Sequence, residues 1–451
     1  MARRTRILNG LVLAALLVLG PAGVLAESTD AGHDDFDQEA LEQENQRSDS
    51  EESGGGSYQS GGSSATASKS KLEVHGFLTQ AYADGSFLEG RFPGPGGVPQ
   101  GPTFDERAIG IPEDGTFNYR AMALQFRYEM TPQDIFVVQL SSRALGDSPI
   151  SNVEDEVELD WAFYERRLGD DTAVKLGRVQ IPFGIFNELR DVGTILPFYR
   201  APFLFYREGA FTSETVDGIV LSHIFGAASD WSFETDFFVG RWDSIEQDPI
   251  GTAGVAKANN EGYGFQFWLN TPVSGLRFGL GGHHRDVTEG AEGVLRLPGA
   301  TSKLDDFYFS VEAAFERIVF RAEYREFEGD PETSPAFGAT DFSSTINQVY
   351  GQLGYHPTDK LRFYVQYETG DSDIFASIFT NDFTVTLRED LGFAVNYLFS
   401  PNLVLKAEYH EVSGEDFTFF PTVGPAGFQL VPLVTDLDDG NYYILSFSVS
   451  F

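Results

Sequence analysis

From Lys71 to Phe451, apolar and polar residues alternate in short segments that are separated by residues typical of turns. The segment 441–451 shows this clearly, because from Tyr443 onward every second side chain is apolar and serines fill three of the positions between. A period of two places successive side chains on opposite faces of a β-strand. The pattern therefore predicts strands with one apolar and one polar face. For the last segment alone, an edge strand of a soluble β-protein is the alternative.

About sixteen such segments are predicted, with boundaries that sequence reasoning places only approximately. The predicted strands are 71–83, 118–129, 134–143, 156–168, 172–179, 215–225, 230–241, 261–270, 276–285, 304–316, 318–327, 345–356, 360–369, 386–399, 402–412 and 441–451.

The connections between these segments alternate between short and long. The short ones are 130–133, 169–171, 226–229, 271–275, 316–317, 357–359 and 400–401. The long ones are 84–116, 144–155, 180–214, 242–260, 286–303, 328–344, 370–385 and 413–441. Outer-membrane barrels join their strands in this way, with short periplasmic turns and long extracellular loops. A soluble sandwich or propeller has no reason to alternate so strictly.

The polar face of the predicted strands is ionic in several places. In 318–327, for example, Arg321, Glu323 and Arg325 alternate with apolar residues. Buried charges are costly unless they meet water or a partner, so this face is expected to line an aqueous lumen. The sequence thus predicts an all-β fold, a transmembrane antiparallel β-barrel of about sixteen strands.

Composition agrees with a barrel. Aromatic residues make up 14 % of the 451 residues, yet the mean hydropathy is −0.19. After the amino-terminal segment, no apolar run reaches the ~20 residues that a membrane helix needs. The chain has no cysteine and seven scattered histidines, and neither G-x-S-x-G nor H-E-x-x-H occurs. We therefore expect no enzyme, no metal site and no cofactor, and the pattern gives no indication of nucleic-acid binding.

The chain divides into three predicted parts. Residues 1–26 are typical of a signal peptide, with three early arginines, an apolar core and small residues at Val24 and Ala26 before the expected cut. Residues 27–70 are acidic and then rich in glycine and serine, which predicts a disordered periplasmic leader. Residues 71–451 form the predicted barrel.

The third long connection, residues 180–214 (the third loop), differs from the other long connections, which are acidic or rich in small polar residues and are expected outside. It carries eight aromatic residues, and a loop this apolar is expected to fold back into the barrel and narrow the pore. Its candidate constriction residues are Glu188, Arg190, Asp191, Arg200, Arg207 and Glu208.

Charged residues of the preceding strands are candidates for the pore wall. These are Arg127, Arg143, Glu158, Asp160 and Arg166, which fall on the predicted polar face. One interpretation is a charge-separated constriction. The alternative is a set of salt bridges that brace the wall.

Three stretches resemble an outer-membrane porin family of Gram-negative bacteria, related to the phosphate-selective porins. They are the opening LEVHGFLTQAYAD after a leader, the strand and loop LGRVQIPFGIFNELRDV, and the closing strand with its final phenylalanine. The resemblance covers residues 71–451 as architecture and is motif-like in 71–84, 174–208 and 441–451.

The resemblance implies a homotrimeric channel, with Phe451 as part of the signal that the barrel-assembly machinery reads. It also implies contacts with periplasmic chaperones, outer-membrane lipid and lipopolysaccharide. Phosphate-selective members line the constriction with lysine and arginine, whereas here the arginines of the third loop are matched by acids. This departure puts phosphate selectivity in doubt.

The net charge of −37 indicates an acidic channel mouth, while the nearest charges, those of the third loop, are balanced and outrank the distant total. An acidic channel mouth concentrates cations over about a Debye length. We therefore expect passive diffusion of small hydrophilic solutes and ions through the outer membrane, with weak cation preference. An anion- or phosphate-selective porin is the alternative, and a non-conducting structural or adhesin barrel is an alternative of another class.

Overall fold

The structure is a computed structural model of the whole chain. It describes residues 71–91, 99–148, 156–206, 214–247, 255–289, 301–329, 333–334, 338–339, 343–375, 379, 381–424 and 427–451. The predicted signal peptide and leader, residues 1–26 and 27–70, lie outside these residues. In the described part, no helix has the length and apolarity needed to cross a membrane.

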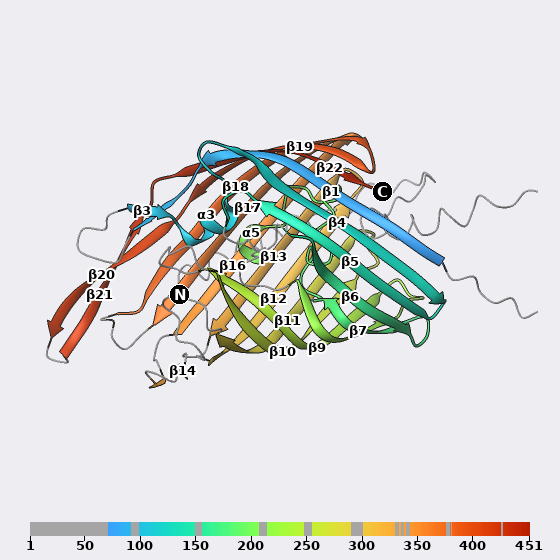
Figure 1. Cartoon of the computed structure of the whole chain (residues 1–451), viewed down its shortest axis with the longest axis horizontal. Coiled ribbons are helices and arrows are strands. Elements are labelled where there is room, and N and C mark those ends of the chain that lie inside the picture. Colours follow the sequence, from blue (N-terminus) through green and yellow to red (C-terminus); the bar gives the residue numbers. More distant parts are fainter. Residues whose placement is uncertain are drawn as a thin grey trace, which may run out of the picture. The chain divides into compact units, whose positions relative to one another are not determined.

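Sixteen long strands of the described chain form the barrel (Figure 1). They are β1 (Lys71–Ser86), β4 (Thr116–Thr131), β5 (Asp134–Leu145), β6 (Glu158–Arg167), β7 (Thr172–Gln180), β8 (Thr215–Phe225), β9 (Ser232–Gln247), β10 (Val255–Asn270), β11 (Leu276–Glu289), β12 (Thr301–Phe315), β13 (Ile318–Gly329), β16 (Ser343–Thr358), β17 (Leu361–Phe375), β18 (Phe383–Ser400), β19 (Leu403–Ser413) and β22 (Gly440–Ser450). Each predicted strand overlaps one of them, so the predicted fold class is confirmed.

The barrel is closed because β1 pairs with both β4 and β22. Every other pairing joins neighbours along the ring, and all of them are antiparallel. Closure leaves no unpaired strand edge, which is the condition for a sheet to span a bilayer.

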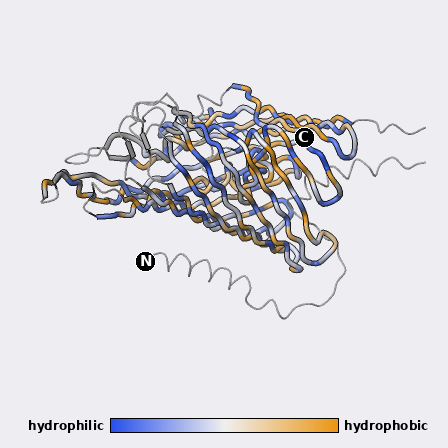
Figure 2. The backbone as a smooth tube through the Cα atoms, turned by 90° about the horizontal axis from the view of Figure 1, so that it is seen from below, coloured by the Kyte–Doolittle hydropathy of each residue, from blue (hydrophilic) through white to orange (hydrophobic). Residues whose placement is uncertain are grey.

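The two faces of the strands differ as the alternation predicted, and Figure 2 shows apolar and polar residues alternating along the tube. Large apolar side chains face outward and are exposed, such as Leu78, Phe237, Phe309, Phe393 and Phe447. Their inward neighbours are largely polar or charged, such as Thr79 and Ser448, which hydrogen-bond to each other at 2.9 Å.

Outward tyrosines are hydrogen-bonded to acidic residues toward the end of the barrel that carries the long loops. Tyr82 and Tyr443 both donate to Asp84, at 3.0 and 2.6 Å. Tyr324 donates to Glu326 at 3.0 Å, and Tyr367 donates to Glu389 at 2.8 Å. Such a ring of aromatic side chains with polar tips matches the boundary between lipid hydrocarbon and headgroups.

Shorter elements lie in the long loops. They are β2 (Glu89–Arg91), β3 (Pro99–Pro102), β14 (Thr333–Ser334), β15 (Gly338–Ala339), β20 (Glu415–Gly424), β21 (Gly427–Asp436), α3 (Phe104–Ile109) and α5 (Phe203–Tyr206). The hairpin β20–β21 extends one loop, while α3 and α5 pack against residues of the barrel wall. None of these elements was predicted from the sequence.

Phe451 lies against Gly76 at the seam between β1 and β22. Two backbone hydrogen bonds join them, from Gly76 N to Phe451 O at 2.9 Å and from Phe451 N to Gly76 O at 3.0 Å. A β-carbon at Gly76 would come within 2.2 Å of the Phe451 ring. Only glycine therefore leaves room for the ring at this position.

Candidate functional site

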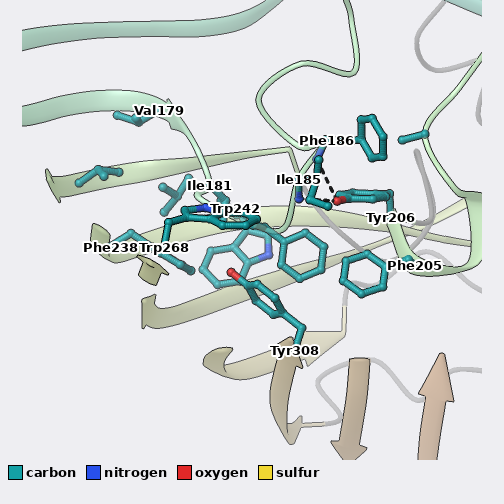
Figure 3. Packing of buried hydrophobic residues seen from close by; sticks show 14 of the residues in the cluster. Val179, Ile181, Ile185, Phe186, Phe205, Tyr206, Phe238, Trp242, Trp268 and Tyr308 are labelled. Carbon is teal, nitrogen blue, oxygen red and sulfur yellow. Dashed lines mark hydrogen bonds between the residues drawn. The ribbon is translucent and has the colours of Figure 1, made fainter. Parts of the chain in front are cut away.

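The third loop crosses the lumen. Its short helix α5 lies inside the ring of strands (Figure 1). Most of residues 181–206 are buried, and their aromatic side chains pack with inward residues of the wall (Figure 3). This agrees with the prediction that the loop folds into the barrel.

Aromatic packing fixes the loop on one side of the wall. Phe183 stacks on Phe205 with ring centroids 5.3 Å apart, and its edge meets Tyr308 of β12 at 4.7 Å. Trp242 of β9 and Trp268 of β10 belong to the same buried cluster. Each large apolar side chain removed from water contributes about 1.5–3 kcal/mol, so the cluster holds the loop firmly in place.

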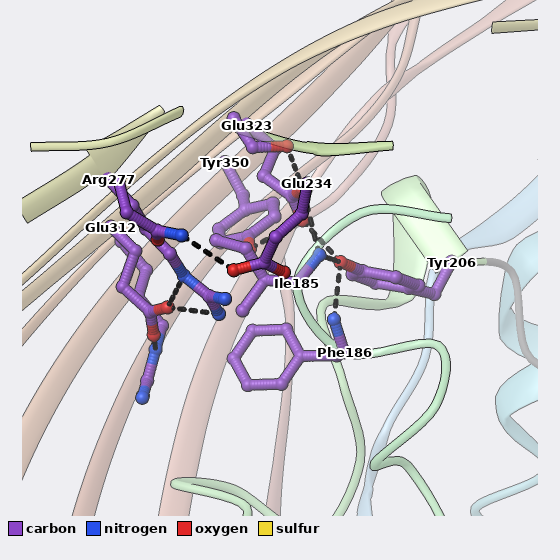
Figure 4. A network of polar contacts seen from close by, with 11 residues as sticks. Ile185, Phe186, Tyr206, Glu234, Arg277, Glu312, Glu323 and Tyr350 are labelled. Carbon is purple, nitrogen blue, oxygen red and sulfur yellow. Dashed lines mark hydrogen bonds and ion pairs between the residues drawn. The ribbon is translucent and has the colours of Figure 1, made fainter. Parts of the chain in front are cut away.

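Buried wall carboxylates accept hydrogen bonds from the loop backbone. Glu368 of β17 accepts from the N–H groups of Phe203 and Leu204, at 3.3 and 2.9 Å. Glu323 of β13 accepts from Ile185 N at 3.1 Å and from the Tyr206 hydroxyl (Figure 4). These bonds satisfy loop donors that would otherwise be buried without a partner.

Wall donors meet the loop carbonyls in the same way. Lys406 of β19 donates to Phe198 O at 2.8 Å, and Asn396 of β18 donates to Pro197 O at 2.9 Å. Arg325 of β13 donates to Phe205 O at 2.7 Å. The loop is thus anchored to strands β13, β17, β18 and β19, far from its own ends on β7 and β8.

A cluster of acids and arginines joins the other part of the loop to β5 and β6. Arg143 of β5 binds Asp191 at 2.6 Å and Glu214 at 3.0 Å. Gln139 of β5 donates to both Asp160 and Asp191, at 2.9 and 3.0 Å. Three candidates predicted from the sequence, Arg143, Asp160 and Asp191, therefore lie together in the structure.

Arg190 belongs to the same cluster. Its Nε lies 2.9 Å from Glu214 Oε1, and only 2 % of its side chain is exposed. Arg190 therefore braces the base of the loop, whereas the sequence placed it at the constriction surface. Bracing by salt bridges is the alternative predicted for the wall charges, and here it applies to a residue of the loop.

The pKa values within the loop part of this cluster diverge. Burial raises the pKa of Asp191 well above its usual range, and the neighbouring Asp160 and Glu214 carboxylates act in the same direction. Burial also acts to raise the pKa of Glu214, but the charges of Arg143 and Arg190 outweigh it and lower that pKa. Asp191 is therefore the loop carboxylate of this cluster that takes up a proton first.

Carboxylates of Asp160, Asp191 and Glu214 place ligand atoms within 4.8 Å of one another. Such spacing could hold a metal ion with oxygen ligands. Arg143 and Arg190, however, already neutralise two of the three negative charges at close range. The donor set therefore fits an ion-pair network better than a metal centre.

Glu188 and Glu158 differ from these residues because they are exposed on the inward side. The carboxylate of Glu188, on the third loop, repels the carboxylate of Asp236 of β9. The ammonium group of Lys175 of β7 attracts the same Asp236 carboxylate. Glu158 of β6 lies opposite Ser141 of β5, on the inward face that also carries Gln139 and Arg143. Acidic side chains thus contribute to the exposed inward face near β6 to β9, beside the basic side chain of Lys175.

The first loop, between β1 and β4, also enters the barrel. Glu106 of α3 forms an ion pair with Arg388 of β18, and both side chains are buried. Ala108 and Ile109 pack in one cluster with Tyr199, Phe203 and residues of the wall. The expectation that only the third loop turns inward is therefore wrong. The apolar residues of α3 are too few to mark it in the sequence.

Arg200 connects these two loops. Its guanidinium donates to the Tyr119 hydroxyl and to Ile109 O, the latter at 3.5 Å, and it lies 5.5 Å from the Tyr119 ring centroid. Arg200 thus braces the third loop against the first loop. The sequence had placed it in the constriction.

Arg166 was predicted on the pore wall, but the structure places it outside. It pairs with Asp134 at 2.5 Å on the face that carries Tyr164 and Phe136. The reason is a register shift opposite Gln139 and Leu140, which makes Asp160 an extra residue in β6. Such a bulge reverses the alternation, so the residues facing inward change from even to odd numbers.

Arg127 faces inward, as predicted, and forms an ion pair with Glu73 at 2.9 Å. The remaining candidates, Arg207 and Glu208, lie outside the described residues. Their place at the constriction stays a prediction.

Several residues of the site were missed by sequence reasoning, chiefly Glu323, Glu368, Arg388 and Lys406. The alternation predicts that each of these side chains faces inward, but it predicts the same for many other charged residues. These four differ because they contact loops that are distant from them in the sequence.

No family model and no curated protein sequence matches the chain. Solved structures do match. Outer-membrane expressed OmpT of Vibrio cholerae has 12 % identity and a TM-score of 0.51, covering 85 % of this chain and 98 % of that chain. A trimer form of in-vitro folded OmpT from the same organism has 13 % identity and a TM-score of 0.50, covering 85 % and 99 %.

An anion-selective porin from Comamonas acidovorans has 11 % identity and a TM-score of 0.50, covering 85 % of this chain and 100 % of that chain. At this level of identity the likeness concerns the fold alone. It agrees with the closed barrel of sixteen strands described above.

Proposed function

We propose that the chain is an outer-membrane channel for passive diffusion of small hydrophilic solutes and ions, with weak cation preference. One observation supports this proposal most directly. A barrel with an apolar outer face encloses inward charges, and part of that lumen stays accessible on the side that Glu158 and Glu188 face. Inward charges at that position are stable only in contact with water.

The outer membrane is the location that this architecture supports. The outward apolar side chains form a band around the barrel, and the ring of outward tyrosines marks one boundary of it. The predicted signal peptide at 1–26 supports export, and the solved outer-membrane barrels supply the fold analogy.

Cation preference follows from the distribution of charge inside the barrel. Inward charges of β12 to β19 are largely buried, and several of them form ion pairs, as in Glu312 with Arg321 and Asp306 with Arg325. The exposed inward charges near β6 to β9 include Glu158 and Glu188. Because nearby charges dominate over distant ones in water, these carboxylates favour cations along the open side.

An anion-selective channel remains the second candidate, since one structural neighbour is an anion-selective porin. A non-conducting structural barrel is the candidate of another class, and the two loops inside the lumen favour it over an entirely open pore. Single-channel recording separates all three, by the sign of the reversal potential or by the absence of current steps.

Neutralising Glu188 tests the charge argument. Glu188→Gln is expected to reduce the ratio of K⁺ to Cl⁻ permeability to roughly half, because an exposed carboxylate at the passage is lost. The reversal potential in a KCl gradient measures this ratio. Glu411→Gln is the matched control, since Glu411 is exposed but faces outward beside Tyr409. Equal shifts in both variants would contradict a local role for Glu188.

Acidification is expected to weaken the cation preference, and the change should begin at a higher pH than an ordinary aspartate would give. The raised pKa of Asp191 means that this carboxyl binds a proton at a higher pH than an ordinary aspartate. Each proton bound removes a negative charge from the acidic side of the lumen. Asp191→Asn should reduce the pH dependence, and a preference that strengthens on acidification would contradict this assignment.

Residues 27–70 are proposed to be a leader outside the conducting path. A chain that lacks them is expected to keep the single-channel conductance of the full chain, because the segment is polar, acidic and rich in glycine and serine. Bilayer recording of both chains checks this. A large difference would mean that the leader enters the lumen.

We further propose a homotrimer that the barrel-assembly machinery inserts with periplasmic chaperones. One trimeric structural neighbour and the position of Phe451 at the barrel seam support this. Cross-linking in membranes measures the oligomer directly.

A further inference from the structure

Glu323 lies where the third loop meets the wall of the barrel. It is 0 % exposed on the inward face of β13, and its two oxygens accept from four groups. Oε1 accepts from Ile185 N at 3.1 Å and from the Ser310 hydroxyl, and Oε2 accepts from the Tyr206 hydroxyl and from the Tyr350 hydroxyl at 2.7 Å. Two of these donors belong to the loop and two belong to the wall.

The loop is shaped to reach this carboxylate. Tyr206 receives hydrogen bonds from Ile185 N at 2.7 Å and Phe186 N at 2.9 Å while donating to Glu323, so one hydroxyl ties two distant parts of the loop to the wall (Figure 4). Gly184 has a positive φ of 63°, and a β-carbon there would lie 2.8 Å from Glu323 Oε1 and 2.5 Å from the Tyr206 hydroxyl. A side chain at Gly184 would push the loop off the carboxylate.

The Glu323 carboxyl group is the shared acceptor of these buried donors, and removing it deprives several of them of a hydrogen bond. The wall around Glu323 keeps its own support, since Arg321 is bound by Glu312 and Arg325 by Asp306. Loss of Glu323 therefore affects the loop more than it affects the strands.

We propose that Glu323 is the positioning residue that latches the third loop to the β12–β16 wall and thereby sets the width of the passage. The effect on the width of the passage rests on the proposed channel function, whereas the attachment of the third loop by Glu323 does not. When the latch is absent, residues 184–186 and Tyr206 leave the wall more often, and the loop samples wider positions in the lumen.

A thiol reporter tests the latch without requiring conduction. The chain has no cysteine, so Ile185→Cys introduces a single thiol at a position that is 6 % exposed. Labelling of the folded full chain in detergent by a membrane-impermeant maleimide then measures how often this part of the loop opens. In the Ile185→Cys background, Glu323→Gln and Tyr206→Phe are expected to label about ten times faster or more, because loop hydrogen bonds are lost.

Tyr350→Phe is the matched control. It removes a hydroxyl from the same Oε2 atom, but this hydroxyl comes from the wall. Its labelling rate is expected to stay within about threefold of the parent. Gly184→Ala is also expected to label faster, because its side chain would push the loop off the wall while every charged residue is kept. Mobility on unheated gels confirms that each variant is folded.

Two results would overturn the latch. One is an unchanged labelling rate in Glu323→Gln, Tyr206→Phe and Gly184→Ala. The other is equally fast labelling in the Tyr206→Phe and Tyr350→Phe variants, which would show a general loss of packing. Faster labelling in a chain that gives no current would retain the latch and contradict the channel function. In a conducting chain, the fast-labelling variants should also show larger and noisier current steps than Tyr350→Phe.

Discussion

Replacing residues 182–213 by a short glycine–serine linker is expected to raise the single-channel conductance on the order of threefold, because the segment that crosses the lumen is removed. The barrel should still close. Ile181 N donates to Glu214 O at 2.9 Å, so the two ends of the segment are adjacent and continue the pairing of β7 with β8.

The wall is expected to tolerate this change. Glu323, Glu368 and Lys406 would lose their loop partners, but water that fills the lumen can solvate them. Conductance in planar bilayers and mobility on unheated gels give the two readouts. A folded variant with the conductance of the wild type would show that the third loop does not limit the passage.

Replacing Phe451 by alanine is expected to lower the amount of folded barrel in the outer membrane by roughly fivefold or more, since the ring that packs on Gly76 is lost at the seam. Gly76→Val should have a similar effect from the other strand. Its side chain would occupy the space of the ring and displace Phe451, together with two backbone hydrogen bonds worth about 1–3 kcal/mol.

The control for this prediction is Phe451→Tyr, which keeps an aromatic ring over Gly76 and should assemble as the wild type does. Heat-modifiable protein in outer-membrane fractions measures the folded amount. Full assembly of both Phe451→Ala and Gly76→Val would show that the seam does not depend on this contact.

Strand positions could be predicted from the sequence because the alternation is a local property. It depends on each strand facing an apolar environment on one side and a polar one on the other. The residues at which the strands end could not be predicted as well. β9 and β10, for example, pair up to Gln247 and Val255, beyond the predicted 230–241 and 261–270, where the sequence no longer alternates.

The inward fold of the third loop was also predictable, because its aromatic residues require burial. The roles of its charges were not. Arg190 is held by Glu214 at the far end of the same loop, and Arg200 is held by Tyr119 of β4. Arg166 was placed on the wrong face because a single extra residue in β6 reverses the alternation, and a bulge has no clear mark in the sequence.

The acids that hold the loop show the same limit. Glu323 and Ile185 are 138 residues apart in the chain, and Glu368 and Leu204 are 164 apart. Their inward direction follows from alternation, but their contacts follow from how the loop crosses the closed barrel. Sequence pattern therefore predicts which residues face the lumen and leaves open which of them hold the loop.

Single-channel recording of the purified full chain in a planar bilayer with a KCl gradient tests the central claim most directly. Discrete current steps are expected, with a reversal potential whose sign shows that K⁺ permeates somewhat more readily than Cl⁻. The potential should become smaller as the salt concentration increases. Repeated incorporation of folded protein without current steps would contradict the diffusion channel, and a clear preference for Cl⁻ would contradict the acidic passage.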